Sequence, residues 1–532
     1  MLIRRNAKEL ANVFELNGVP SFRQFYDVGI FYWKCIYRGY LDSWHVCPAP
    51  TINEPFRKRK RAYLSMGKAL CSEMANLIWS ENCKVQVNQR GYDSENPDPL
   101  QFFIAQVLKD NNFNVKMRTL IEQSLALGGG AIRTYVDGMR NEEGQLYVLK
   151  DENGKLIKGL DVKLSYYMAD QFIPLAWDNS TVTEGIFIEK KAKDGFYYTK
   201  LEFHQRNGEE YVVSNRFFKT DRPPVGNTSQ CILGIETPFQ QVWNGIASEV
   251  RLKNISDGLF TYFAPSIANN LDDNSPLGIS IYANASDTLK CLDVAFDSFQ
   301  REMILGRKRV IVPASCIRSV RTVDGREVRY FDANDEAYEA FNSDSTEQLK
   351  IQDNTVELRI DEHIKAINAL LDILCMQCGL SVGTLSFDKA GGLKTATEVI
   401  SENSKTFRTV KLMQEPLKAS IERTIANIIE IARLYDVSFL MDGVEYSVDE
   451  LTRNGCNTSV IFDDSIIQDR QADISEGILL VQNSVMSKRT FLENVLGYTP
   501  EQADKEIERL KEEAKEGAGM KLEAIDWNNI GG

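Results

Sequence analysis

The sequence predicts a multidomain α+β protein, and three observations carry this prediction. Alternating strand patterns cluster between residues 131 and 218, helical periodicity fills the segments on either side, and one helical pattern runs unbroken over residues 395–436. The 532 residues suggest about three or four domains. A formal net charge of −13 argues against tight binding of nucleic acid over the whole outer surface, although local clusters of lysine and arginine still offer contacts.

The first 80 residues follow a helical pattern, and the last helix of this region is predicted from Arg57 to Trp79. It begins with the basic run Arg57–Arg61, which as a solvated face needs no partner. The alternative is a contact with phosphate or an acidic neighbour, because positive charge at a helix N-terminus opposes the macrodipole. An aromatic segment at 22–44 is interrupted by charges, which favours a buried packing or subunit-contact segment over a helix at a membrane surface.

The central region alternates with the two-residue period of β-strands. After a short strand at 84–87, helices are predicted over 100–127 with a break near Asp110, and Gly128–Gly130 ends them. Turn signals such as Asn153-Gly154 and Asp194-Gly195 separate some of the strands that follow, so the region reads as an antiparallel sheet. The predicted strands are 131–136, 145–149, 162–167, 185–189, 196–203 and 211–218.

Two amphipathic helices, at 286–305 and 361–380, bracket a small unit with strand character. That unit opens with the basic residues Arg307, Lys308 and Arg309, and Asp324-Gly325 is a hairpin signal within it. Beyond the long helical pattern, short strands are predicted at 438–441 and 458–462. Helices follow at 469–481, 488–496 and 500–514.

A glycine-rich corner precedes the long helix, and it is the most informative feature of the chain. The pair Gly391-Gly392 can adopt backbone angles that other residues avoid, and Thr395 or Thr397 can cap the helix that follows. A helix from there to about residue 435 would be about 60 Å long, and Pro416 is predicted to kink it. A mobile loop joined to a long kinked helix indicates a mechanical part and not a catalytic pocket.

Enzymatic motifs receive no support from the sequence. A phosphate-binding P-loop needs glycine directly before the lysine, whereas Leu393 separates Gly392 from Lys394. The three histidines lie in different segments, and the ten scattered cysteines form no disulfide framework, which fits a reducing cytosol. The one close pair, Cys375 and Cys378 in an apolar helix, is predicted to be buried structural thiols and not a redox or zinc site. The acidic pairs at 272–273 and 463–464 suit loops and caps, with a cation site as the alternative. We therefore expect no catalytic residue, metal or cofactor.

Three stretches of the sequence resemble the portal, or head-to-tail connector, proteins of tailed bacteriophages, in particular those of siphophages and myophages of Gram-positive hosts. The first is Ser275–Ser280, which leads into Asp287 and the helix containing Asp293 and Asp297. The other two are Gly391–Val399, and Phe462–Asp469 with the later Ser487-Lys488-Arg489. Their order along the chain matches the portal family over most of its length, and the N-terminal region matches less clearly.

The resemblance implies a ring, usually of twelve copies, at one vertex of the capsid, and it divides the chain into named parts. These are a wing (1–283), a first stem helix (284–305), a clip (306–358), a second stem helix (359–380), a tunnel loop (381–394), a long kinked wing helix (395–436), and a crown with the C-terminal tail (437–532). The ring would be a channel for packaging and ejecting double-stranded DNA without reading its sequence. The terminase and then a neck adaptor or head-completion protein would dock on it, and it would also meet the major capsid and scaffold proteins.

Specific residues follow from this assignment. The channel residues of the tunnel loop would be Ser386, Asp388, Lys389, Gly391, Gly392 and Lys394. The cluster Arg307, Lys308 and Arg309 would touch DNA or form salt bridges between subunits. Gly379 and Gly383 would act as hinges, and Pro416 would set the kink. The protein is expected in the virion and, during assembly, in the host cytoplasm, with no membrane partner. The alternatives are another ring-forming virion protein of the tail or baseplate without DNA in its bore, or a cytosolic enzyme of unrecognised type.

Overall fold

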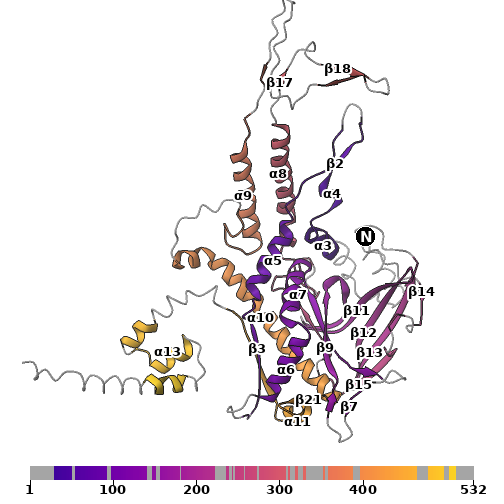
Figure 1. The fold of residues 1–532 in the computed structure, drawn as a ribbon, viewed down its shortest axis with the longest axis vertical. Helices are drawn as coiled ribbons and strands as arrows, with labels where there is room; N and C mark the ends of the chain where they lie inside the picture. Colours follow the sequence, from indigo (N-terminus) through magenta and orange to yellow (C-terminus); the bar gives the residue numbers. More distant parts are fainter. Residues whose placement is uncertain are drawn as a thin grey trace, which may run out of the picture.

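A computed structural model defines the architecture of the chain (Figure 1). It describes residues 29–50, 54–90, 92, 98–140, 146–150, 156–179, 181–221, 235–238, 242–243, 246–256, 258–271, 275–306, 310–311, 318–321, 327–330, 352–353, 357–386, 396–463, 477–483, 485–495 and 503–510. Helices and sheets share one large apolar core, which confirms the predicted α+β class. Among these residues, no helix combines the length and apolar character needed to cross a membrane.

The N-terminal region differs from the prediction at its basic run. Helices α3 (Phe31–Tyr37) and α4 (Asp42–His45) lead into a two-stranded hairpin of β1 (Val46–Pro48) and β2 (Lys58–Lys60). The basic run therefore lies on an extended strand, and the helix that was predicted from Arg57, α5, spans only Met66–Ile78. The helix starts late because Asp293 and Asp297 bind backbone amides of the segment before it.

Two helices cover a small sheet. Helix α6 (Pro99–Asp110) is capped by Asp98, whose carboxylate accepts a hydrogen bond from the backbone N–H of Leu100 at 2.8 Å. Helix α7 (Phe113–Leu127) ends at Gly128 in the left-handed conformation, so the predicted glycine stop is confirmed. The three strands that follow this corner are antiparallel, in the order β16 (Phe260–Phe263), β4 (Gly130–Asp137) and β9 (Asp161–Met168).

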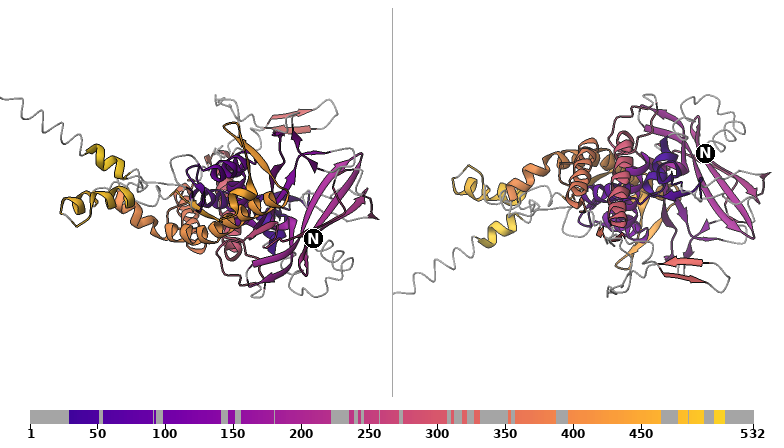
Figure 2. Two further views of the ribbon diagram at one scale, coloured as in Figure 1. Left: turned by 90° about the horizontal axis from the view of Figure 1, so that it is seen from below. Right: turned by 90° about the horizontal axis from the view of Figure 1, so that it is seen from above.

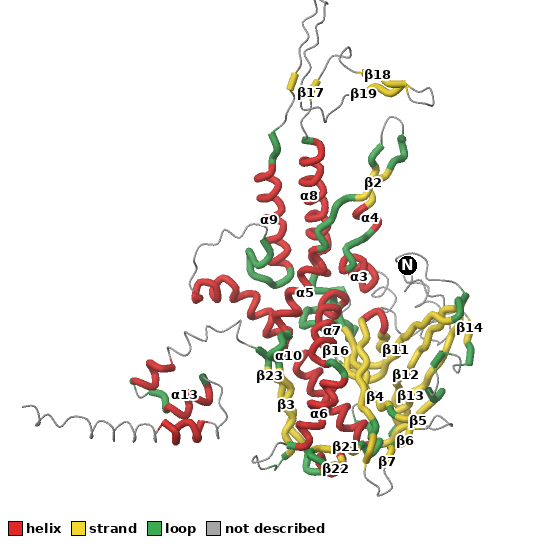
Figure 3. Tube along the Cα trace, in the orientation of Figure 1, coloured by secondary structure: helices red, strands yellow, loops and turns green. Residues whose placement is uncertain are grey.

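A six-stranded antiparallel sheet lies beside this unit, at the right of Figure 3. The predicted strands at 185–189, 196–203 and 211–218 are confirmed, but each continues several residues further because polar residues can extend a paired hairpin beyond the core. The strand order is β10 (Phe172–Asp178), β11 (Thr181–Lys193), β12 (Phe196–Asn207), β13 (Glu210–Thr220) and β14 (Ile235–Glu236), with β15 (Glu249–Lys253) also on β13. Short ribbons join β5 (Met139–Arg140) to β6 (Leu146–Tyr147) and β7 (Leu149–Lys150) to β8 (Leu156–Lys158).

Two long helices project from the body, side by side (Figure 1). They are α8 (Ser286–Leu305) and α9 (Ile360–Gln377), close to their predicted bounds. The segment between them contains the hairpin predicted around Asp324-Gly325 and one further strand pair that was not predicted. Strand β17 (Val310–Ile311) pairs with β20 (Gln352–Asp353), and β18 (Arg318–Arg321) pairs with β19 (Glu327–Tyr330).

The long predicted helix is confirmed as α10 (Ala396–Leu434), which has 39 residues. Its apolar stripe from Val410 to Ile428 is buried, and Figure 1 shows it crossing the body diagonally towards β21 (Ser438–Met441), β22 (Val444–Ser447) and α11 (Val448–Thr452). Strand β23 (Cys456–Ile461) then pairs with β3 (Lys84–Gln89), which ties the C-terminal part to the N-terminal helices. Helical segments at 477–482, α13 (Lys488–Asn494) and 503–510 lie apart from the body in both views of Figure 2.

Candidate functional site

The junction between α9 and α10 holds the beginning of the predicted tunnel loop. Helix α9 ends in a Schellman motif: Gly379 takes a φ of 78°, and the N–H of Leu380 donates to the carbonyl of Cys375 at 2.8 Å. Leu380 is fully buried beneath this turn. Cys375 and Cys378 are buried as predicted, and burial raises the pKa of the Cys378 thiol to about 12, so neither is a reactive thiolate.

Helix α10 fixes the first residues of the loop through side-chain hydroxyls. Thr406 and Ser381 form a reciprocal pair: the Ser381 N–H donates to the Thr406 hydroxyl at 2.8 Å, and the Thr406 N–H donates to the Ser381 hydroxyl at 3.2 Å. Thr409 donates to the carbonyl of Gly379 at 2.7 Å, and Lys405 donates to the carbonyl of Met376 at 3.0 Å. The segment 379–381 is therefore anchored to α10 by side-chain hydrogen bonds.

The remaining predicted loop residues divide between the described and the undescribed parts of the chain. Gly383 is exposed with a φ of 80°, its N–H donates to Asp372 at 3.1 Å, and half-buried Ser386 closes the described segment. The hinge role of Gly379 and Gly383 stays a prediction. Five predicted channel residues lie outside the described residues: Asp388, Lys389, Gly391, Gly392 and Lys394.

Pro416 lies inside α10, as predicted. Its missing N–H cannot bond to the preceding turn, and the carbonyl of Pro416 accepts a hydrogen bond from the Ser420 hydroxyl at 2.8 Å. The kink itself stays a prediction. Because neighbouring side chains of α10 are buried on both sides of this position, the helix is held by the core and not by its own propensity.

Helices α8 and α9 pack against each other, and side-chain hydrogen bonds join them at both ends. Thr288 donates to Gln377 at 2.8 Å near the body, while Arg359 binds Glu302 in a fork at 3.1 and 2.9 Å near the far end. His363 stands 3.9 Å from Glu302. The predicted basic cluster Arg307, Lys308 and Arg309 directly follows α8 but lies outside the described residues.

The basic run near residue 59 has the acidic partner that the sequence left as an alternative. Arg59 binds Asp297 of α8 with both terminal nitrogens, at 2.7 and 2.5 Å, and these hydrogen bonds lower the pKa of the Asp297 carboxyl. One turn earlier, Asp293 accepts from the ring of His45 at 3.1 Å and from the N–H of Leu64 at 3.0 Å. Two aspartates spaced four residues apart on a predicted helix were the available signal for this clasp.

A buried ionic cluster joins the two sheets and was not identified from the sequence. Arg133 of β4 lies 2.5 Å from Glu202 of β12, and Lys200 lies 3.0 Å from both Glu202 and Glu189 of β11. Burial opposes ionisation of Glu202, but the charges of Arg133 and Lys200 and the contact with His204 together outweigh it and hold the pKa of that carboxyl well below its usual range. Its sequence signal is Lys200, Glu202 and His204, which alternate on one face of a predicted strand.

His204 completes this cluster as a neutral ring. Its Nε2 lies 3.0 Å from Glu202, and its Nδ1 lies 2.9 Å from the hydroxyl of Tyr211, which itself accepts from the N–H of Leu259 at 3.2 Å. This chain of contacts assigns the proton to Nε2, which donates to Glu202, and leaves Nδ1 to accept from Tyr211. Burial lowers the pKa of His204, so the folded protein resists its protonation.

We expect the stability of wild-type protein to fall as the pH drops below about 6.5, in part because of His204. The unfolded chain then binds a proton that the folded chain excludes. Each pH unit therefore removes up to about 1.4 kcal/mol until the lowered folded-state pKa is reached. The variant His204→Gln removes this site and keeps a hydrogen-bonding side chain. Urea unfolding of both proteins between pH 8 and 5 measures the difference, and parallel pH profiles would contradict the neutral assignment.

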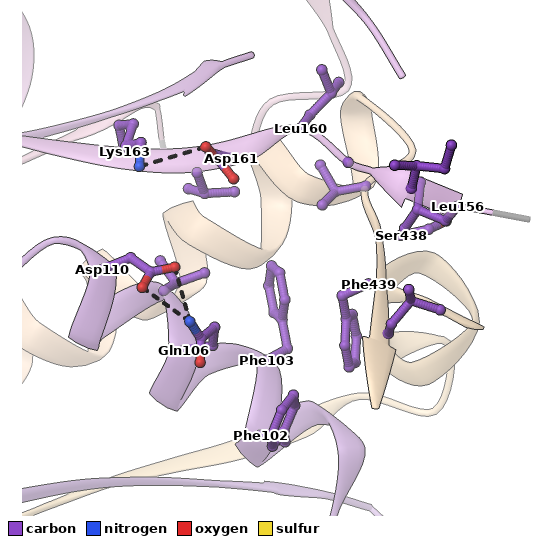
Figure 4. Close-up of a pocket in the computed structure, with 16 residues that line it drawn as sticks. Phe102, Phe103, Gln106, Asp110, Leu156, Leu160, Asp161, Lys163, Ser438 and Phe439 are labelled. Carbon is purple, nitrogen blue, oxygen red and sulfur yellow. Dashed lines mark hydrogen bonds and ion pairs between the residues drawn. The ribbon is translucent and has the colours of Figure 1, made fainter. Parts of the chain in front are cut away.

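One pocket of about 390 Å³ is lined by residues of α6, β8, β9 and β21 (Figure 4), and these elements lie at the end of the body opposite the α8–α9 pair (Figure 1). Its apolar wall comes from α6 and β21, where the rings of Phe103 and Phe439 stack with centroids 5.1 Å apart. Its rim is polar: Gln106 donates to Asp110 at 3.0 and 3.1 Å, and Lys163 pairs with Asp161 at 3.6 Å. The charged groups of this rim thus have hydrogen-bond or ion-pair partners among themselves, and they leave no unpaired buried charge among the described lining residues that would select a ligand.

Comparison with known proteins gives one result for nearly the whole chain. A family model described as "Phage portal protein, SPP1 Gp6-like" matches residues 28–520. No curated protein matches the chain. The match extends from the residues before α3 to beyond the helical segment at 503–510, and so includes the α9–α10 junction and the projecting pair α8 and α9.

Proposed function

Because the chain belongs to the family of phage portal proteins of the SPP1 Gp6-like type, we propose that twelve copies form its ring at the unique vertex of the capsid. A portal protein of this family is a structural component of the virion and not an enzyme. Its ring encloses a channel for DNA and associates with the capsid and the terminase. The observation that carries this function is the family match across residues 28–520.

The named parts of a portal find counterparts in the fold. Helices α8 and α9 serve as the stem, along the ring axis, and residues 306–358 between them serve as the clip. Residues 1–283 serve as the wing, which α10 crosses, and residues 437–532 serve as the crown. Two points support this assignment: α8 and α9 project together from the body, and the four strands that the structure describes between them pair with one another, β17 with β20 and β18 with β19.

The loop 381–394 serves as the tunnel loop, with Lys389 and Lys394 touching the DNA backbone. A channel must pass duplex DNA without retaining it, and each phosphate that a lysine or arginine neutralises strengthens binding through counterion release. An acidic chain with few local cations keeps those contacts weak and independent of sequence. Arg307, Lys308 and Arg309 supply a second ring of such contacts or salt bridges between subunits.

The clip serves as the docking site for the terminase during packaging and for a neck adaptor or head-completion protein afterwards. The crown and wing face the major capsid and scaffold proteins during assembly in the host cytoplasm. Negative-stain images of purified protein test the central assignment. We expect end-on views of closed rings with a bore that admits duplex DNA. Solitary copies, or a ring whose bore is closed to DNA, would overturn the proposal.

Changing Gly391 and Gly392 together to valine is expected to leave rings assembled and to reduce DNA packaging. β-branched residues cannot readily adopt the backbone angles that a moving loop requires. The measurement is nuclease-protected DNA per capsid in a packaging reaction with the terminase. Gly208→Val is the matched control, because Gly208 lies in a surface turn with a φ of 64° and open space around it. Packaging at the wild-type level in the double variant would exclude the moving loop.

A further inference from the structure

We propose that the β1–β2 hairpin fastens adjacent copies in the ring, with Phe56 of one copy packed on the apolar end of the neighbouring α8–α9 pair. This inference rests on the proposed assignment of α8 and α9 to the stem. The partner is therefore a second copy of this chain.

The hairpin is an arm whose base is fixed, because α8 holds Arg59 of β2 and the residues on either side of the hairpin at four points. Asp297 accepts from Arg59 and from the N–H of Ala62, and Asp293 accepts from His45 and from the N–H of Leu64. The two aspartates lie one turn apart on one face of α8, so they fix both the position and the direction of the hairpin. Its tip is thus presented at a set height along the stem, with little ordering entropy left to lose on contact.

The tip carries a large apolar side chain with nothing to cover it. Phe56 is 92% exposed, the highest value for a large hydrophobic residue in the described part of the chain. Exposed Arg57 and Lys58 follow it directly, and exposed Glu54, two residues before it, lies 3.8 Å from Arg57. An aromatic anchor flanked by cations is typical of the centre of a protein interface, where aromatic residues and arginine are enriched.

The complementary surface lies at the far ends of α8 and α9, and we call it the stem collar. Its apolar members are each 37 to 51% exposed: Met303, Ile304, Leu305, Leu358 and Ile360. The two helix ends adjoin, since Arg359 binds Glu302 and a Cβ on Gly306 would meet Leu358 at 2.2 Å. Exposed carboxylates lie on the α9 side of the collar at Glu357, Asp361 and Glu362, opposite in sign to Arg57 and Lys58, while the basic cluster that follows α8 lies outside the described residues.

The geometry excludes the collar of the same copy and favours the neighbour. The hairpin binds the Asp293 face of α8, while α9 packs on the opposite face near Phe299 and Glu302, so the arm points away from its own α9. Figure 1 shows the arm reaching the height of the upper ends of α8 and α9 on the far side of α8. In a closed ring, rotation alone relates the copies, so surfaces that touch must lie at one height along the axis. The tip and the collar meet that condition.

A photoreactive benzophenone side chain at position 56 of the full-length protein tests the contact directly. Rings are assembled from equal amounts of unlabelled and nitrogen-15-labelled chains, checked by electron microscopy, irradiated and analysed by mass spectrometry. We expect mixed-label peptides that join position 56 to residues 303–305 or 358–360. Cross-links within one chain only, links to other residues, or no links in intact rings would overturn the inference. Failure to form rings at all would instead overturn the proposed function, and this inference with it.

Assembly measurements give a second, independent readout. Phe56→Asp is expected to raise the chain concentration needed for half-assembly by about tenfold or more, because it places a carboxylate against the acidic collar. Val115→Asp is the matched control, since Val115 is also exposed and lies on α7, away from the stem. Equal effects of the two substitutions would show that Phe56 has no special role.

Discussion

Replacing Glu202 with leucine is expected to destabilise the folded chain by about 3–5 kcal/mol, because it leaves two buried cations, Arg133 and Lys200, with the single carboxylate of Glu189. Arg133 and Lys200 both bind Glu202 in a region that excludes water, so neither can recover its hydration when the carboxylate is removed. The measurement is the midpoint of urea-induced unfolding, followed by circular dichroism at a chain concentration too low for rings to form.

The control for this variant is Glu236→Leu in the same sheet. Glu236 forms a two-bond fork with Arg216, but both side chains are substantially exposed, so the loss is expected to stay below about 1 kcal/mol. The double variant Arg133→Met/Glu202→Leu removes one charge of each sign and leaves Lys200 with Glu189, so it should recover part of the loss. Equal costs for Glu202→Leu and Glu236→Leu would show that the buried cluster is not what joins the sheets.

Gly128→Ala is expected to be the most disruptive substitution of a single methyl group. Gly128 has a φ of 87°, and a Cβ there would lie 2.3 Å from the carbonyl oxygen of Gly278. The left-handed backbone alone costs an alanine about 1–2 kcal/mol, and separating two packed backbones adds about 1–3 kcal/mol. The corner at Gly128 contacts the segment that leads into α8, so the change should also reduce ring assembly.

Gly195→Ala separates the two contributions. Gly195 has a similar φ of 77°, but nothing lies within 4 Å of the position of its Cβ, so only the backbone cost applies. Urea midpoints for the two variants, together with the fraction of chain in rings, give the comparison. If Gly195→Ala were as destabilising as Gly128→Ala, the close approach of Gly128 to Gly278 would add nothing to the loss of folding free energy.

The contacts between the hairpin segment and α8 could not be predicted from the sequence. The run from Arg57 to Arg61 was interpreted as a solvated face, with an acidic partner as the alternative. Asp293 and Asp297 formed part of a recognised motif, but nothing in the sequence joined the two. Their separation along the chain is more than 230 residues. Local periodicity also placed the helix start at Arg57, because it could not account for backbone amides that bind distant carboxylates.

The buried ionic cluster could not be predicted from the sequence for a similar reason. Each strand that contributes to it was predicted, yet the charged members look like the solvated face of those strands when each strand is read alone. Only the packing of one sheet against the other encloses Arg133, Lys200 and Glu202 together. The anchoring of the loop at Ser381 by Thr406 likewise depends on where α10 lies and not on local pattern.

The sequence by itself determined the α+β class, the paired helices 286–305 and 361–380, the long helix after the glycine-rich corner, and the family. These depend on periodicities and motifs that are local along the chain. The tertiary structure alone decided the partners of the charged residues, the contact of Gly128 with Gly278, and the direction of the hairpin arm. Those features depend on contacts between residues far apart in sequence, which become defined only when the core brings their elements together.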